Sequence, residues 1–466
     1  MENGKGQFKN TFGFLMAAVG SAVGLGNIWG FPYKMGNGGG FAFLAIYIVL
    51  AVLIGYVIML GELTLGRNSG KGIILTYKEL SNKFTILGVM GFLSPYLILS
   101  FYSMLGGYCL KYSLSNLLAI FNKNSLIMNV DPGEYFVSFF ADPLMSTLFT
   151  LIFVAATAIV VAGGVSKGIE KFSVVAMPLL FLLLVILIVR AVTLDGGTQG
   201  LEFMFKPNWE AFKGTGWISV FASAGGQMFF SLSLGMGIMI TYGSYIPKDQ
   251  PIAKNAATII FFDTVIAIMA GMIVMPAVFA FGMEPAAGPS LLYISLQNVF
   301  QSMGAWGPLF GFLFFFLVSI AAITSSISLL EVLTSSVIDA RVAKNKPADR
   351  KKATIGVTVA VALLAAFVSL DGLGTANMPH IFGQGTWLDT FDLLSEGLMM
   401  PLSALLMSLL LGWYLKENFL EKELTLHGNK FPARTFTMAC FKVIAPIGML
   451  FILLGQISNF FGLGWF

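Results

Sequence analysis

The sequence predicts an all-α polytopic membrane protein, a bundle of helices that crosses a lipid bilayer many times. Of its 466 residues, 57% are hydrophobic and only 11% are charged, and the mean hydropathy is +0.84, so no soluble core could hide its apolar surface. The apolar residues gather in repeated stretches of roughly 20, the length that crosses a hydrocarbon layer about 30 Å thick. These stretches are too long and too unalternating for barrel strands. A lipid bilayer is therefore the expected partner, and no nucleic acid is.

Eleven apolar segments predict eleven crossings. The first continues into the bundle without a small-residue cleavage site, so we expect it to be retained rather than removed as a signal peptide. Cys109 and Cys440 both fall inside apolar segments, which indicates neither a disulfide framework nor a metal cluster. The expected crossings are 11–35, 41–68, 87–118, 144–163, 172–193, 217–246, 255–281, 307–340, 354–370, 387–415 and 436–457.

The basic residues indicate the orientation of the bundle. They concentrate in alternate loops, whereas the other loops carry mostly acidic residues. By the positive-inside rule the basic loops are cytoplasmic, so we expect the N-terminus inside and the C-terminus outside the cell membrane. The basic loops contain Lys5 and Lys9; Arg67, Lys71, Lys78 and Lys83; Lys167 and Lys171; Lys248 and Lys254; Lys344, Lys346, Arg350, Lys351 and Lys352; and Lys416, Lys422, Lys430 and Arg434.

Two of the segments contain residues that disfavour a continuous helix. The first reads GSAVGLGNIWGFP over residues 20–32, and the sixth reads FFSLSLGMGIMITY over 229–242. Each has a glycine pair near its middle, and five crossings separate the two pairs. An odd offset makes the second half enter from the opposite side, which predicts an inverted five-helix repeat. The repeats would span 11–193 and 217–415, with an eleventh helix at 436–457 outside them.

A bound ligand would explain such interruptions. Backbone groups freed at membrane depth cost several kcal/mol each unless something bonds them. The carbonyls of Gly20, Ala22 and Val23 with the Asn27 amide oxygen suit a small hard cation, and N–H groups at a half-helix N-terminus attract a carboxylate. An amino acid with a co-transported cation would satisfy both. Packing of small residues between helices is the alternative explanation, and two breaks at equivalent repeat positions make it the less favoured one.

Polar residues in other segments are further candidates. Thr324, Ser325 and Ser326 lie in the eighth segment, where hydroxyls usually bond to their own helix but could also complete a cation site beside the first break. Asp263 lies deep in the seventh segment, where its negative charge would offset a bound cation. Solvation at a helix mouth is the alternative for Asp389 and Asp392. The ionisable residues within or at the ends of segments are Glu62, Asp263, Glu331, Asp389, Asp392 and Glu396.

The chain from Lys5 to about Ile457 resembles the neurotransmitter:sodium symporter family, in particular its bacterial eleven-helix members, which are sodium-coupled amino-acid transporters. The resemblance implies a LeuT-like five-plus-five inverted-repeat fold and alternating access. It rests on several motifs together: GSAVGLGNIWGFP (20–32), NGGGFAF (37–43), GELTLGR (61–67), GQMFFSLSLGMGIMITYGSY (226–245) and ITSSIS (323–328).

The resemblance implies two sodium sites. The first would consist of the substrate carboxylate together with the Ala22 carbonyl, Asn27, Ser231 and Asp263, and Ser231 is also expected among the substrate-binding residues. The second would consist of the carbonyls of Gly20, Val23 and Ala321 and the hydroxyls of Thr324 and Ser325.

The resemblance also assigns the substrate site. The carboxylate would meet the N–H groups near Leu25 and Gly26 and the Tyr102 hydroxyl, and the ammonium would meet carbonyls near Ala22, Phe230 and Ser233. Because Met236 can adapt to irregular shapes, we expect a large hydrophobic or aromatic amino acid. The side-chain pocket would be lined by Ile98, Phe230, Met236, Ser325 and Leu329.

The gates complete the expected machinery. Tyr102 and Phe230 would form a lid over the substrate, and Glu62 would bond backbone near the breaks. The inner-gate positions are Lys5, Phe8, Tyr245 and Asp339.

The outer gate departs from the family pattern, because this chain has Gly30 where many relatives have Arg. Lys34 follows one helical turn later, and we expect it to pair with Asp392 instead. Asp263 replaces a neutral residue of chloride-dependent relatives, which implies independence of chloride. A channel or a sensor with the same architecture is the alternative function, and no pattern indicates an enzyme.

Overall fold

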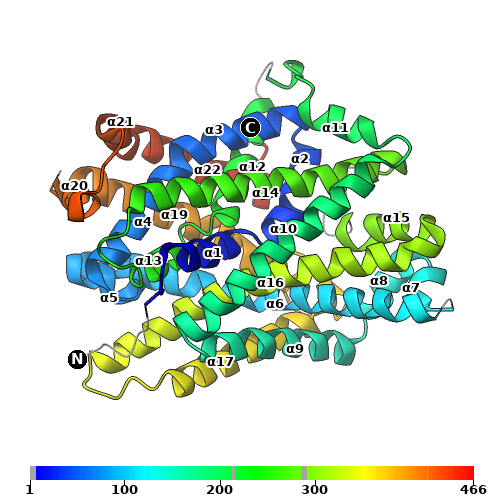
Figure 1. Cartoon of the computed structure of the whole chain (residues 1–466), viewed down its shortest axis with the longest axis horizontal. Helices are drawn as coiled ribbons and strands as arrows, with labels where there is room; N and C mark the ends of the chain where they lie inside the picture. Colours follow the sequence, from blue (N-terminus) through cyan, green and yellow to red (C-terminus); the bar gives the residue numbers. More distant parts are fainter. Residues whose placement is uncertain (1–6, 123, 213–215, 285–290, 417, 466) are drawn as a thin grey trace.

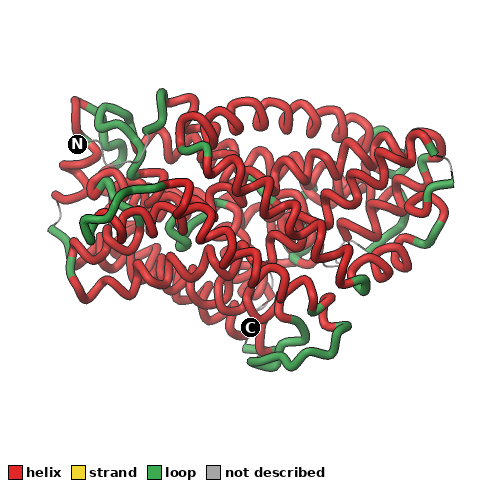
Figure 2. Tube along the Cα trace, turned by 90° about the horizontal axis from the view of Figure 1, so that it is seen from below, coloured by secondary structure: helices red, strands yellow, loops and turns green. Residues whose placement is uncertain are grey.

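The computed structural model describes residues 7–122, 124–212, 216–284, 291–416 and 418–465, and none of these residues forms a strand (Figure 2). Long helices lie side by side along the longest axis of the molecule (Figure 1). The first half contains α1 (Thr11–Ala22), α2 (Phe31–Asn37), α3 (Phe41–Leu50), α4 (Tyr56–Ser69), α5 (Ile73–Leu80), α6 (Thr85–Phe121), α7 (Leu126–Asn129), α8 (Pro132–Phe140), α9 (Pro143–Ala162), α10 (Lys171–Val192) and α11 (Gly197–Phe205).

The second half is also built from helices. It contains α12 (Gly216–Ser231), α13 (Ile238–Gly243), α14 (Ile252–Ala280), α15 (Leu296–Ser302), α16 (Gly307–Val342), α17 (Arg350–Leu370), α18 (Trp387–Asp392), α19 (Met400–Leu409), α20 (Asn418–Leu424), α21 (Arg434–Ala439) and α22 (Ala445–Phe461).

The membrane spans agree with the apolar segments of the sequence. Among the described residues, nine continuous helical runs are long and apolar enough to cross a membrane, and the bent pair of α1 and α2 makes ten. The remaining expected crossing, 217–246, consists of α12 and α13. These helices have 16 and 6 residues, so neither alone is long enough to cross a membrane. Observed ends lie a few residues from the expected ones, as for Ile252–Ala280 against 255–281.

Several short helices outside the crossings were not predicted. They lie at the two ends of the bundle, with α5 and α20 at one end and α7, α8 and α15 at the other (Figure 1). We call these the α20 end and the α15 end. Segments of 4 to 9 residues, such as α7 and α8, are too short to give a clear hydrophobic period, which is why the sequence did not reveal them.

The first break interrupts the first crossing. Helix α1 stops at Ala22 because Val23 is extended (φ −81°, ψ 99°), and the chain resumes through a π-helical turn over Gly26–Gly30 that leads into α2. The two halves are bent by 48° relative to each other. Pro32 lies in the first turn of α2, where its missing N–H is tolerated.

The second break separates α12 from α13. Gly235 and Gly237 have φ of +75° and +76°, the left-handed region that glycine adopts without steric cost. Ser233 also has a positive φ, +55°, which is uncommon for a residue with a side chain. The glycines were predicted from the sequence, but the conformation of Ser233 was not.

Helices α4 and α13 touch through their backbones. A Cβ atom on Gly66 would lie 2.0 Å from the carbonyl oxygen of Ile240, and one on Gly243 would lie 2.6 Å from that of Leu63. Glycine at both positions therefore permits the close approach that brings Glu62 beside the second break.

We predict that Gly66→Ala lowers the thermal unfolding midpoint of the detergent-purified protein, because the new methyl group forces α4 and α13 apart at a cost of about 1–3 kcal/mol. Gly356→Ala in α17 is the matched control. A Cβ there meets no atom within 4 Å, so its midpoint should be unchanged or slightly raised. Equal midpoints for both variants would contradict the backbone packing.

Candidate functional site

A small cavity lies where the two breaks meet α6 and α16. Its interior leaves about 20 Å³ for the centre of a water-sized sphere, so a larger ligand requires side chains such as Phe230 and Met236 to move. All the predicted substrate-binding residues line it except Leu25 and Ser231. The lining residues are Ser21, Ala22, Gly24, Gly26, Ile98, Tyr102, Phe230, Ser233, Met236, Ile238, Ser325 and Leu329. Ser21, Gly24 and Ile238 were missed, although each adjoins a predicted break.

The wall of the first break has no room for a side chain. A Cβ atom on Gly24 would lie 2.3 Å from Ser325 Oγ and 2.5 Å from Tyr102 Oη. Leu25 contributes through its backbone, because its N–H donates to Tyr102 Oη at 3.0 Å. The structure thus brings the backbone near Leu25 and Gly26 together with Tyr102, the groups expected to meet a carboxylate.

Asp263 forms the centre of one polar cluster. Its fully buried carboxylate accepts hydrogen bonds from Asn27 Nδ2 (2.8 Å), Ser231 Oγ (3.0 and 3.1 Å) and Tyr47 Oη (3.1 Å). Three of the residues expected at the first sodium site are therefore in contact, and the fourth, Ala22, lines the adjoining cavity. Tyr47 was missed. The only signal was a tyrosine inside an apolar segment, where a buried hydroxyl needs a partner.

A second cluster consists of uncharged oxygens. Ser325 Oγ lies 3.3 Å from the Val23 carbonyl oxygen and 3.5 Å from that of Gly20. Thr324 Oγ1 lies 2.8 Å from the Ala321 carbonyl oxygen and 3.5 Å from that of Val23. All five oxygens predicted for the second sodium site thus belong to one cluster between α1 and α16. Such hard oxygens fit a small cation.

Two side chains support the broken backbone from outside the cavity. Glu62 Oε1 accepts the Gly235 N–H at 2.7 Å, and Gln227 Nε2 donates to the Gly26 carbonyl at 2.7 Å. Gln227 was missed because glutamines also serve ordinary helix packing. A Cβ on Gly30 would lie 2.9 Å from Gln227 Oε1, so the absence of a side chain at position 30 makes room for this support.

The expected inner-gate residues lie near the α20 end. Phe8 packs edge-on against Tyr245, with ring centroids 6.2 Å apart, and Asp339 accepts a hydrogen bond from the Gly72 N–H. Lys5 lies outside the described residues. Tyr245 Oη donates to Glu331 Oε1 at 2.5 Å.

Glu331 also pairs with Arg350, whose Nη1 lies 3.1 Å from Glu331 Oε1. The sequence indicates Glu331 only as an ionisable candidate and Arg350 only as one of the basic residues that orient the bundle. Their pairing joins α16 to the first residue of α17, a contact that the sequence pattern does not indicate.

The structure pairs Lys34 with Glu396 rather than with the predicted Asp392, although the Lys34 charge still acts on the Asp392 carboxyl. Lys34 Nζ instead lies 2.6 Å from Glu396 Oε1, one turn further along the chain than Asp392. The flexible lysine stem accommodates this longer reach, and a π-helical stretch from Leu393 to Met399 alters the direction of the side chains after Asp392. A pocket of about 390 Å³ contains all three side chains, and it is lined by Tyr33, Lys34, Asn37, Gly38, Ser219, Val220, Ser223, Asp392, Glu396, Gln456, Asn459 and Phe460.

Comparisons with known proteins place this geometry in context. The family model described as the sodium:neurotransmitter symporter family matches residues 5–125 and 141–465. An uncharacterized sodium-dependent transporter of Bacillus subtilis, YhdH, is 35% identical over 97% of this chain and 98% of its own length. An uncharacterized sodium-dependent transporter of Haemophilus influenzae is 32% identical over 96% of each chain.

More distant and structural matches agree with this result. The sodium- and chloride-dependent GABA transporter ine of Drosophila melanogaster is 23% identical over 97% of this chain and 51% of its own. The crystal structure of MhsT in complex with L-phenylalanine matches with a TM-score of 0.86 and 35% identity, over 97% of this chain and 100% of that chain.

Proposed function

Because this chain belongs to the sodium:neurotransmitter symporter family and has its LeuT-like fold, we propose that it imports a hydrophobic or aromatic amino acid by sodium-coupled symport with alternating access. The observation that carries the proposal is the cavity between two broken helices, where backbone groups, hydroxyls and apolar side chains face one small space. An amino acid and sodium ions together offer partners for all three kinds of group.

Sodium binds at two positions in this proposal. At the first, Ala22, Asn27, Ser231 and Asp263 hold an ion that the substrate carboxylate also contacts, and the Asp263 charge offsets it. At the second, the neutral oxygen cluster between α1 and α16 holds an ion that joins a broken helix to an unbroken one. Sodium at these positions favours the arrangement in which the substrate site is complete, and this is the origin of coupling.

The lining of the cavity supports the substrate class. Tyr102, Ser233 and Ser325 form a polar part for the ammonium and carboxylate, while Ile98, Met236, Ile238 and Leu329 form an apolar part for the side chain. MhsT, which matches over its whole length, was crystallised in complex with L-phenylalanine. We also propose that residues 11–193 and 217–415 form inverted repeats. The two breaks then lie at equivalent positions of the two repeats.

The orientation follows from the charges. The α20 end faces the cytoplasm because the basic loops of the sequence gather there, and the α15 end faces the outside. In the transport cycle Lys34 and Glu396 then belong to the outer side of the site, and Phe8, Tyr245 and Asp339 to the inner side.

We predict that proteoliposomes containing the protein accumulate labelled tryptophan, tyrosine or leucine against a gradient only when external sodium is present. Large hydrophobic amino acids should compete and glycine should not, because Met236 and Leu329 define a wide apolar wall. Potassium in place of sodium is the control. Equilibration without accumulation would indicate a channel, and binding without any movement would indicate a sensor.

Chloride is the second ion to consider, since the Drosophila relative is named sodium- and chloride-dependent. In this chain Asp263 provides a fixed negative charge beside Asn27 and Ser231. A carboxylate that the protein itself supplies replaces an anion that would otherwise be needed to balance sodium.

We therefore predict that replacing external chloride with gluconate, at equal sodium, leaves the initial uptake rate within about twofold, because the balancing charge is covalently attached. Equal osmolarity and membrane potential serve as controls. A collapse of uptake in gluconate would show that Asp263 does not fulfil this role.

The outer gate gives a third prediction. Glu396→Gln removes the charge that Lys34 contacts, and we expect the initial uptake rate to fall about tenfold, since a charged hydrogen bond contributes about 1.5 kcal/mol or more. Asp392→Asn is the comparison, and it should reduce the rate less than Glu396→Gln does, because Lys34 contacts Glu396 directly. If Asp392→Asn has the larger effect, Asp392 rather than Glu396 is the functional partner of Lys34, as the sequence alone indicated.

A further inference from the structure

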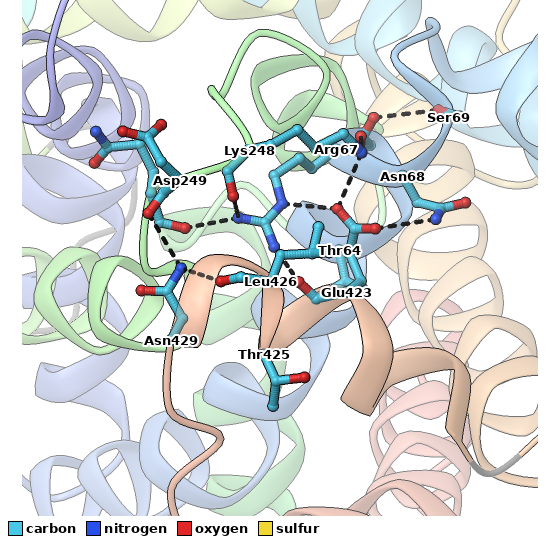
Figure 3. Close-up of polar contacts among 12 residues, drawn as sticks. Thr64, Arg67, Asn68, Ser69, Lys248, Asp249, Glu423, Thr425, Leu426 and Asn429 are labelled. Atoms are coloured by element: carbon cyan, nitrogen blue, oxygen red, sulfur yellow. Dashed lines mark hydrogen bonds and ion pairs between the residues drawn. The ribbon is translucent and has the colours of Figure 1, made fainter.

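Arg67, the third residue from the end of α4, is buried although it carries a permanent charge. All three of its guanidinium nitrogens are used (Figure 3). Its Nε donates to Glu423 Oε1 at 2.8 Å, its Nη2 donates to the Glu423 carbonyl, and its Nη1 donates to the carbonyls of Gln250 (2.6 Å) and Lys248 (3.4 Å). The sequence indicated Arg67 as one of the charges that orient the chain and as the last residue of the GELTLGR motif, but it indicated no partner for it.

Glu423, on α20, is the counter-charge that permits this burial. Its carboxylate also accepts hydrogen bonds from Lys248 Nζ at 3.2 Å and from Asn68 Nδ2 at 3.1 Å. Burial alone would raise the pKa of Glu423, but the bonds from Asn68 and Arg67 and the charge of Lys248 outweigh it, so its pKa lies below the ordinary value. The carboxylate is therefore ionised across the physiological pH range.

The same network reaches both broken helices. Residues 248–250 belong to the link between α13 and α14, and Gln250 also accepts a hydrogen bond from the hydroxyl of Thr11, the first residue of α1. Lys248 Nζ donates back to the Arg67 carbonyl at 2.7 Å. Through Arg67 one carboxylate on α20 thus joins the ends of α1, α4, α13 and α14.

Helix α20 is separate from the four helices whose ends it joins. It follows the crossing that ends near Tyr414, and Asn429 just beyond it donates to the Asp249 carbonyl at 3.1 Å. Removing the Glu423 charge would leave Arg67 and Lys248 as two adjacent cations, one of them buried. The guanidinium would then no longer fix the backbone of Gln250, the residue whose side-chain oxygen accepts the Thr11 hydrogen bond.

We propose that Glu423 is a positioning residue for coupled transport, a clasp that makes the cytoplasmic ends of α1, α4, α13 and α14 move as one group. This inference rests on the proposed function. With the clasp intact, α1 cannot swing toward the cytoplasm separately from α13, so sodium and amino acid are released together. Without it, α1 opens alone, and the gradient of one solute is no longer coupled to the other.

Glu423→Gln tests the clasp. We expect the accumulation ratio of labelled amino acid at a fixed sodium gradient to fall about fivefold or more, the lower range of ordinary coupling factors. Sodium-free efflux from preloaded proteoliposomes should rise, while sodium-dependent binding to the purified protein stays within about twofold, because Glu423 does not line the cavity. A merely structural role would lower binding and folded yield without this split between binding and accumulation.

Two further variants make the test decisive. Glu421→Gln removes an exposed pair with Arg434 (3.1 Å) on the same helix and should behave like the wild type. Thr11→Val leaves Arg67 and Glu423 paired but removes the hydrogen bond from α1 to Gln250, so it should raise efflux by itself. It decides the matter if Glu423→Gln does not fold.

The clasp would be overturned if Glu423→Gln showed the same accumulation and efflux as the wild type. If Glu423→Gln cannot be purified, the same result in Thr11→Val would overturn it. Absence of sodium-dependent uptake by the wild type would instead overturn the proposed function.

Discussion

An interrupted helix in a bilayer leaves backbone N–H and C=O groups without partners, and the site of this protein follows from how those groups are satisfied. Water is not available in the hydrocarbon layer, so each unpaired group costs several kcal/mol. The chain satisfies some of them with fixed side chains: Asn27 accepts the Gly24 N–H at 3.1 Å, Glu62 accepts that of Gly235, and Gln227 donates to the Gly26 carbonyl. Glu62 comes from the unbroken α4, Asn27 from the far side of its own break, and Gln227 from the other broken crossing.

The remaining groups at the breaks have only weak or adaptable partners. The carbonyls of Gly20 and Val23 lie 3.3–3.5 Å from hydroxyls of α16, at the long end of hydrogen-bond distances. Hydroxyls can rotate, whereas the Asp263 carboxylate is held by Asn27, Ser231 and Tyr47. The result is a fixed frame beside a cluster of oxygens that are free to change partners. Arg67 follows the same rule at the α20 end, since its buried charge requires Glu423.

The sequence predicted the elements that the bilayer constrains most. Long apolar segments have one stable form in lipid, so the crossings could be read directly, and paired glycines at an offset of five crossings located both breaks. The residues of the two oxygen clusters followed from these breaks with the help of the family resemblance. Positive φ at Gly235 and Gly237 agrees with the reason for choosing them.

What the sequence could not provide were contacts between distant segments. Tyr47 and Gln227 look like ordinary residues of apolar helices until the fold brings them to Asp263 and Gly26. The partner of Lys34 depended on the π-helical stretch after Asp392, which no local pattern indicates. Glu423 is separated from Arg67 by 356 positions and lies in a helix of 7 residues, so neither its location nor its role was visible.

The central claim is that sodium and an amino acid bind at the two breaks as mutual partners, and equilibrium binding to purified protein tests it most directly. The affinity for labelled amino acid is measured across a series of sodium concentrations, and the affinity for sodium is measured with and without amino acid. Linkage requires that each ligand strengthens the other by the same factor, which we expect to be about tenfold or more. An amino-acid affinity that is the same in sodium and in choline would contradict the account.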